Sequence, residues 1–299
     1  MRKVYLDHAS TTPVRKEVID SMLPYLKEYF GNPSVLHDFG EQAKNGIDEA
    51  RVKLSILINC EPSEITFTSS GTESNNFALK GIAFGNQKKG NHIIISSIEH
   101  FSVMNSARTL EKLGFKVTSL PVDKYGVVSP DDVKNAIGPQ TILVSIMHAN
   151  NEVGTIEPIE DISKITREKG VYLHTDAVQT VGNIEVDVRK LGVDLLSLSG
   201  HKFYGPKGVG ALYIRKGVNI LPFMDGGGHE KGLRSGTYNT PGIVGLGKAS
   251  ELAMKKIPER IKVITSLRDK LIKSINERIN NTCLNGHPTL RLPGNVNIS

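Results

Sequence analysis

The sequence predicts an α/β protein whose large domain is built on a mainly parallel sheet. Short β-rich runs alternate with helical patterns from Thr12 to about Gly217. Several of these runs are apolar without interruption, which is typical of strands covered on both faces. The chain has 299 residues, of which 38% are hydrophobic, so it is long enough for about two domains with a large core.

The alternating elements can be placed in order along the chain. A first helix is expected from Thr12, with Pro13 at its first position, and a second helix after Phe39. Strands are expected at Ile65–Thr68, Ile93–Ser97, Lys116–Leu120, Ile142–Met147, Val171–Thr175, Leu195–Ser199 and Gly210–Ile214. Helices are expected between most of them, near Glu73–Phe84, Ser102–Leu113, Pro130–Ala136 and Ile159–Lys169.

The pattern changes after the glycine run Gly226–Gly228. Helical stretches are expected at Pro241–Lys255 and at Pro258–Ile279, and the second is rich in charged residues. The final segment, Leu290–Ser299, begins to look like a strand. This part of the chain therefore does not continue the alternation of strands and helices.

Composition argues against several classes of protein. Two cysteines cannot form a disulfide framework, which favours a reducing, cytoplasmic location. There is no apolar run of about 18 residues and no signal peptide, so neither membrane insertion nor export is expected. The net charge is +6, but the densest basic clusters are the pairs Lys88–Lys89 and Lys255–Lys256. A nucleic-acid site is not expected, whereas anionic small molecules remain compatible with this charge.

Small polar residues lie between the expected strand at Ile65–Thr68 and the helix that follows it. The run from Ser69 to Asn75 includes Gly71 and Thr72, and free N–H groups at a helix start can bind a phosphate. A capping box of Ser70 or Thr72 with Glu73 explains much of the same pattern. Both interpretations remain open from the sequence.

Other polar residues follow the later strands, and the carboxyl ends of parallel strands are where ligands bind in such sheets. These residues are His100, Asn151, Asp176, Gln179 and Lys202. A structural histidine, helix caps and a solvated lysine are the alternative interpretations. Together with a phosphate cradle, however, a lysine and an aspartate form the set that pyridoxal phosphate (PLP) requires. The sequence has no metal-ligand spacing and no nucleotide-binding fingerprint.

The chain resembles a known enzyme family in stretches from Tyr5 to about Gly247. The family is the cysteine desulfurases of the NifS/IscS type, in the class V aminotransferase group of PLP enzymes. The stretches that carry the resemblance are YLDHASTTP, FGNPSVLH, ITFTSSGTESNN, EH at 99–100, HANNEVGTIEPI, HTDAVQTVG, SLSGHKFYGPKGVGALYIR and GGGHEKGLRSGTYNT. Together they are highly specific.

The resemblance implies the fold of the PLP-dependent transferases of fold type I, which is that of aspartate aminotransferase. It divides the chain into an N-terminal arm at 1–13, a large PLP-binding domain at 14–247 and a small α+β domain at 248–299. The arm is expected to contribute to the small domain. The small domain is expected to be incomplete, because the segment at 290–299 stops inside what looks like a strand.

The resemblance also implies roles for individual residues. Lys202 is expected to form the Schiff base with the cofactor and to move the Cα proton. Asp176 is expected to pair with the pyridinium nitrogen, and His100 to stack on the ring as a possible acid or base. The other expected cofactor contacts are Gly71, Thr72, Asn151, Gln179, Ser199, His201 and Thr237. Of these, Thr237 is expected to reach the phosphate across the interface of a homodimer.

The implied reaction converts L-cysteine to L-alanine and passes the sulfur to an enzyme cysteine. The resulting persulfide supplies an iron–sulfur scaffold, another sulfur-acceptor protein or tRNA thiolation. The resemblance places that cysteine, and the arginine that binds the substrate carboxylate, beyond Ser299. Neither Cys60 nor Cys283 is expected to replace the missing thiol, so we expect a truncated desulfurase whose sulfur transfer is doubtful. A selenocysteine lyase, an aminotransferase of the same group and a non-catalytic fragment are the alternatives.

Overall fold

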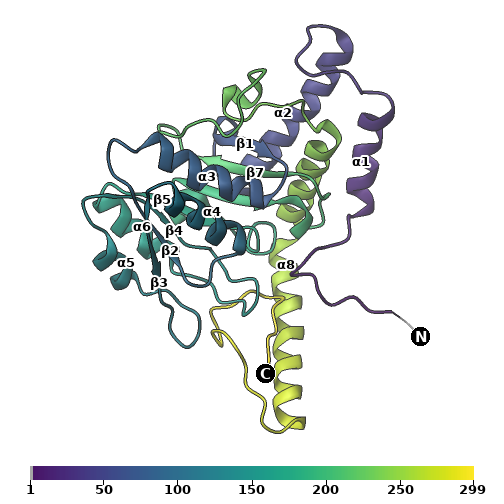
Figure 1. Ribbon diagram of the computed structural model, residues 1–299. Helices are drawn as coiled ribbons and strands as arrows, with labels where there is room; N and C mark the ends of the chain where they lie inside the picture. The colour runs from purple at the N-terminus through teal and green to yellow at the C-terminus, as the bar shows by residue number, and fades with distance from the viewer. Residues whose placement is uncertain (1–2) are drawn as a thin grey trace.

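The computed structural model describes residues 3–299 and contains one seven-stranded sheet with helices on both faces (Figure 1). The strands are β1 (Ile65–Thr68), β2 (His92–Ser96), β3 (Lys116–Leu120), β4 (Thr141–Ser145), β5 (Tyr172–Asp176), β6 (Leu195–Ser199) and β7 (Gly210–Ile214). The helices are α1 (Lys16–Lys27), α2 (Asp38–Ile58), α3 (Gly71–Gly85), α4 (Phe101–Lys112), α5 (Pro130–Ala136), α6 (Ile159–Glu168), α7 (Val188–Leu191) and α8 (Thr240–Arg278). Short 3₁₀ turns, η1 (Pro62–Glu64), η2 (Gly200–Lys202) and η3 (His229–Gly232), complete the elements.

The sheet has the order β1-β7-β6-β5-β4-β2-β3, and only β7 runs antiparallel to its neighbours. This confirms the mainly parallel sheet that the sequence predicts. The expected bounds of β1, β3, β6 and β7 are correct to the residue, and the other strands differ from expectation at their ends. The reversal at β7 lets the glycine-rich turn after β6 lead back along the sheet without a crossover helix.

Two apolar layers cover the sheet, one on each face. Buried side chains of α3 and α4 pack on one face, and those of α2, α5, α6, α7 and the first part of α8 pack on the other. The central strands β4 and β6 are buried along their whole length, which explains their continuous apolar sequences. This layering leaves the ends of the strands, rather than their faces, available for ligands.

The first helix begins later than expected. It starts at Lys16 rather than at Thr12, because Thr12 is held against the 3₁₀ turn η2 that follows β6. The N–H and the hydroxyl of Thr12 each donate a hydrogen bond to the carbonyl of His201, and both bonds are 2.9 Å long. The residues around Thr12 therefore form an N-terminal arm that lies against the turn after β6.

The expectations for the C-terminal part were wrong in two places. The two stretches at Pro241–Lys255 and Pro258–Ile279 form one helix, α8, with Pro258 inside it, so the loss of one N–H donor does not end the helix. The segment at 290–299 forms isolated bridges, such as Thr155 with Arg291, and no strand, because Pro293 and Gly294 interrupt it.

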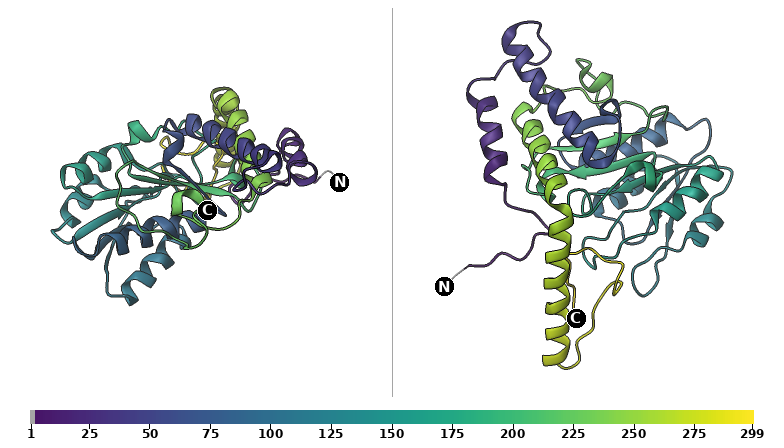
Figure 2. Two further views of the ribbon diagram at one scale, coloured as in Figure 1. Left: turned by 90° about the horizontal axis from the view of Figure 1, so that it is seen from above. Right: turned by 180° about the vertical axis from the view of Figure 1, so that it is seen from behind.

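Helix α8 joins the two ends of the molecule. Its first part packs against α1 and α2, while its second part extends past the sheet beside the C-terminal segment (Figure 2). The domain boundary expected between 247 and 248 lies inside this helix, and the division into domains stays a prediction. Across residues 3–299, no helix combines the length and the apolarity needed to cross a membrane.

Candidate active site

The carboxyl ends of the parallel strands open into a cavity of about 580 Å³. Nine of the ten predicted site residues line this cavity, and they come from five separate segments at or just after the ends of strands. These nine are Gly71, Thr72, His100, Asn151, Asp176, Gln179, Ser199, His201 and Lys202. The fold thus brings together residues that lie up to 131 positions apart, as between Gly71 and Lys202.

The N-terminus of α3 forms one wall of the cavity. Ser70 is the N-cap, and its hydroxyl accepts a hydrogen bond from the Glu73 N–H at 3.1 Å. The Glu73 carboxylate accepts one from the Ser69 N–H at 2.8 Å. The cap is therefore Ser70 rather than Thr72, and the first helical residues Gly71 and Thr72 still face the cavity. A Cβ at Gly71 would collide with the side chain of Val178, so the close approach requires glycine.

Asp176 lies at the end of β5 and is almost completely buried. Its carboxylate accepts hydrogen bonds from the Val178 N–H at 2.9 Å and from the Asn75 side chain at 2.6 Å. Burial raises its pKa, while these hydrogen bonds and the charges of His100 and Lys202 act in the opposite direction. The carboxylate is thus poised to hold a cationic group that enters the cavity.

Asn75 is the most informative site residue that sequence reasoning missed. Its amide donates to Asp176 and, at 2.8 Å, to the hydroxyl of Ser102 on α4. Its buried Oδ1 has no partner among residues 3–299. The available signal was its spacing, because Asn75 lies four positions after Gly71 and therefore on the same face of α3.

Lys202 reaches the cavity from the 3₁₀ turn η2 that follows β6. Its ammonium donates hydrogen bonds to the carbonyls of Ala9 at 2.5 Å and Ser10 at 2.9 Å, both in the N-terminal arm. Burial lowers its pKa, which favours the neutral amine, and the charge of Asp176 partly opposes this. The arm therefore completes the wall around this amine, a contribution that the sequence analysis did not foresee.

The two histidines of the site are fixed by local contacts. His100 is the N-cap of α4, and its Nδ1 accepts a hydrogen bond from the Ser102 N–H at 3.1 Å. His201 contacts the Thr11 hydroxyl at 3.0 Å, and burial lowers its pKa. His100 therefore caps a helix, and the same residue also lines the cavity.

The predicted amide ligands lie at the rim. Gln179 donates to the Ala9 carbonyl at 3.0 Å, so it holds the same arm residue as Lys202. Asn151 donates to its neighbour Glu152 at 2.7 Å and lines the cavity. Both side chains line the cavity and carry amide groups that can donate or accept hydrogen bonds.

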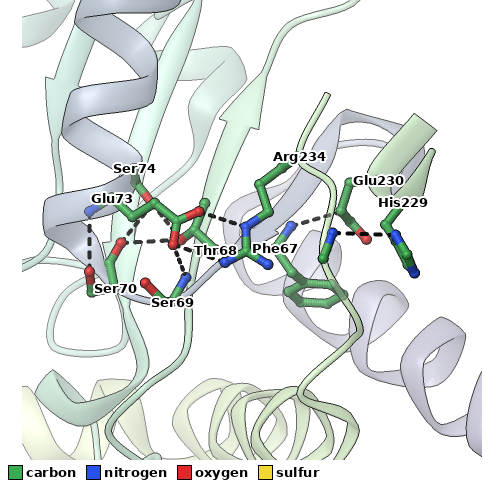
Figure 3. Close-up of polar contacts among 10 residues, drawn as sticks. Phe67, Thr68, Ser69, Ser70, Glu73, Ser74, His229, Glu230 and Arg234 are labelled. Atoms are coloured by element: carbon green, nitrogen blue, oxygen red, sulfur yellow. Dashed lines mark hydrogen bonds and ion pairs between the residues drawn. The ribbon is translucent and has the colours of Figure 1, made fainter. Parts of the chain in front are cut away.

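Thr237 does not lie with the other nine residues. It lines a separate hollow of about 120 Å³ beside Glu230 and Arg234. Two ion pairs hold this loop. Arg51 pairs with Glu230 at 2.6 Å. Arg234 pairs with Glu73 at 2.6 Å, as Figure 3 shows. The expected role of Thr237 across a dimer interface stays a prediction.

Neither cysteine lines the cavity. Cys60 follows α2, and burial raises the pKa of its thiol to about 12, so the thiolate is disfavoured. Cys283 is exposed and pairs through its backbone with Ser299. Both thiols therefore lie outside the group of residues assembled at the strand ends.

Comparison with known proteins identifies the family. The aminotransferase class-V profile matches residues 4–299. The cysteine desulfurase IscS of Dictyoglomus turgidum is 57% identical over 298 residues, which cover 100% of this chain and 76% of that protein. The chain belongs to the IscS-type cysteine desulfurases of the class-V aminotransferase family.

Solved structures agree with this assignment. A NifS-like protein matches with a TM-score of 0.96 and 43% identity over 100% of this chain and 82% of its own. A structure described as SspA in complex with cysteine matches with a TM-score of 0.81 and 47% identity over 83% of this chain and 72% of its own. These matches confirm the fold implied by the resemblance. The alternatives of a lyase, an aminotransferase and a non-catalytic fragment are not favoured.

Proposed function

We propose that this chain binds PLP in the cavity at the strand ends and acts there on L-cysteine. The observation that carries the proposal is the shared cavity of Lys202 and Asp176, an amine whose pKa is lowered and a carboxylate that is buried. The SspA relative was solved with cysteine bound, which supports the same amino acid as substrate. When bound, PLP supplies an electron sink for the charge that develops at the substrate Cα.

The residues of the cavity fit this cofactor at both of its ends. The N–H groups at the start of α3, with Ser199 and His201, suit the phosphate. The Asp176 carboxylate suits a protonated ring nitrogen. Beside it, the buried Oδ1 of Asn75 has no partner in the described chain, which supports a donor from a bound ligand. Lys202 Nζ is the amine that would bond to the aldehyde and hold the Cα proton.

The sulfur-accepting thiol is not one of the two cysteines in the sequence, since both lie outside the cavity. The chain would therefore prepare the substrate, while sulfur transfer to an iron–sulfur scaffold or another acceptor needs a thiol from elsewhere. A cytoplasmic location, favoured by the low cysteine count, belongs to the same proposal.

A homodimer is the proposed active unit. Apolar side chains are exposed between α1 and α2, including Phe30 (70% exposed) and Leu36 (104%). Such a patch is typical of a protein–protein interface. In a dimer, Thr237 would serve the phosphate of the partner's site, which accounts for its separation from the cavity of its own chain.

Reductive trapping tests the cofactor site. The chain is incubated with PLP and treated with borohydride, and the labelled peptide is then mapped by mass spectrometry. We expect the label on Lys202, none after Lys202→Ala, and normal labelling after Lys207→Ala, a matched change at an exposed lysine five positions away. A label on any other lysine in the unmodified chain would refute the proposal.

A further inference from the structure

The start of α3 carries a negative charge where the proposed site must attract an anion. Glu73 is the third residue of the helix whose first residues, Gly71 and Thr72, line the cavity. Its side chain is only 10% exposed, and its pKa is lowered, chiefly by Arg234 and Ser69 against the effect of burial, so the group is ionised. An ionised carboxylate here stabilises the helix but opposes the binding of a second anion at the same N-terminus.

Arg234 neutralises this carboxylate through two hydrogen bonds. Its Nε donates to Glu73 Oε1 at 2.6 Å and its Nη2 to Oε2 at 3.1 Å, a two-pronged contact that fixes the guanidinium plane. Figure 3 shows the guanidinium directed at Glu73 from the loop between η3 and α8. The pair is largely withdrawn from solvent, so little of its charge is screened by water.

The loop that carries Arg234 is held in place independently of this pair. Glu230 accepts hydrogen bonds from Arg51 on α2 and from the Phe67 N–H of β1, and Glu230 itself adopts a left-handed conformation with φ of 49°. The backbone of Ser235 also bonds to the Met224 carbonyl at 3.0 Å. The guanidinium is thus presented by a fixed loop, and its position does not depend on Glu73 alone.

From these contacts we infer that Arg234 is a positioning residue for the phosphate end of the cofactor, acting by cancelling the charge of Glu73. The inference rests on the proposed function, because it concerns the same cavity. It makes an asymmetric prediction: loss of Arg234 leaves an uncompensated anion at the cradle, whereas loss of the Glu73 charge leaves a cation there. A purely structural link between the loop and α3 would be damaged equally by either change.

The test compares two probes that differ only in the phosphate. Affinities for pyridoxal phosphate and for pyridoxal are measured by absorbance titration of the full chain, with inorganic phosphate as a competitor. Arg234→Met is expected to weaken binding of pyridoxal phosphate by roughly tenfold and of pyridoxal by less than about threefold. Glu73→Gln is expected to keep or increase the preference for the phosphate form. The double variant is expected to recover most of the loss.

A matched control and a folding check accompany the measurement. Arg215→Met removes an arginine that pairs at 2.6 Å with Asp194, at the opposite end of β6, and is expected to leave both affinities unchanged. If Arg234→Met does not fold, Glu73→Gln alone decides, because a reduced phosphate preference there contradicts the inference. No change in Arg234→Met, or no recovery in the double variant, also overturns it. A parent chain that binds neither probe would instead refute the proposed function.

Discussion

Two buried carboxyl groups lie at the ends of β5 and β2, which are separated by β4 in the sheet, and they differ in the charges that act on them. Asp176 ends β5 and opens into the cavity that contains Lys202. Glu99 follows β2 and is 3% exposed; it accepts hydrogen bonds from the Ser96 hydroxyl and the Met147 N–H, and its other oxygen has no partner in the described chain. Burial raises both pKa values, that of Glu99 to about 8. Burial is therefore common to the two acids; the charge of Lys202 lowers the pKa of Asp176, whereas the charges that act on Glu99, those of Asp176 and Glu157, raise its pKa.

The largest effect is expected from Asp176→Asn, which removes the charge and keeps the shape. We expect exchange of the substrate Cα proton in D₂O, followed by NMR with L-cysteine and PLP, to slow by at least about 100-fold, because a preorganised charge opposite the ring is lost. Glu99→Gln is the matched control and is expected to change this rate by less than about threefold. Equal losses in the two variants would show that the distinction between the two acids is wrong.

A smaller effect, on stability, is expected from Glu99→Gln. The carboxyl has a pKa of about 8 in the folded protein against 4.5 when solvated, so folding favours its protonated form. The corresponding stability is fully present below pH 4.5 and is lost as the pH rises through 8, with an upper bound of about 5 kcal/mol. The glutamine amide has the shape of the protonated acid and cannot ionise, so the variant should not show this loss of stability.

Urea unfolding at pH 5 and pH 8 measures this difference. The free energy of unfolding of the parent should fall relative to that of Glu99→Gln over this interval. The free energy of unfolding of Asp176→Asn, measured in the same buffers, gives the corresponding comparison for Asp176. A difference between the parent and Glu99→Gln that stays constant with pH would mean that Glu99 is ionised in the folded protein.

The smallest effect is expected from replacing the cysteines. Cys60, like Glu99, is a group whose pKa is raised mainly by burial. Burial raises its thiol pKa to about 12, and the charge of Arg189 opposes this only in part, so the thiolate is disfavoured. Replacing Cys60 and Cys283 together by alanine should leave sulfide release from L-cysteine, measured with PLP and an added dithiol as sulfur acceptor, unchanged within about twofold. A loss of tenfold or more in the rate of sulfide release would show that one of these thiols takes part in the reaction, although neither lines the cavity.

The sequence predicted elements and strand-end residues best where a local pattern decides them. The bounds of β1, β3, β6 and β7 follow from short apolar runs between turn residues, and nine of the ten predicted site residues share one cavity. It predicted least well where distant contacts decide. Thr12 leaves the first helix because it bonds to His201, and α8 continues through Pro258 because one missing donor costs less than the packing that the rest of the helix gains.

By itself, the sequence determined the alternation of apolar strands and helices, and therefore the edge at which Lys202 and Asp176 meet. Only the tertiary structure decided that Asn75 holds Asp176, that the N-terminal arm encloses Lys202 and that Arg234 pairs with Glu73. The reason is physical: periodicity records which face of an element is buried, but hydrogen bonds and ion pairs between side chains far apart in the chain depend on how the buried faces pack.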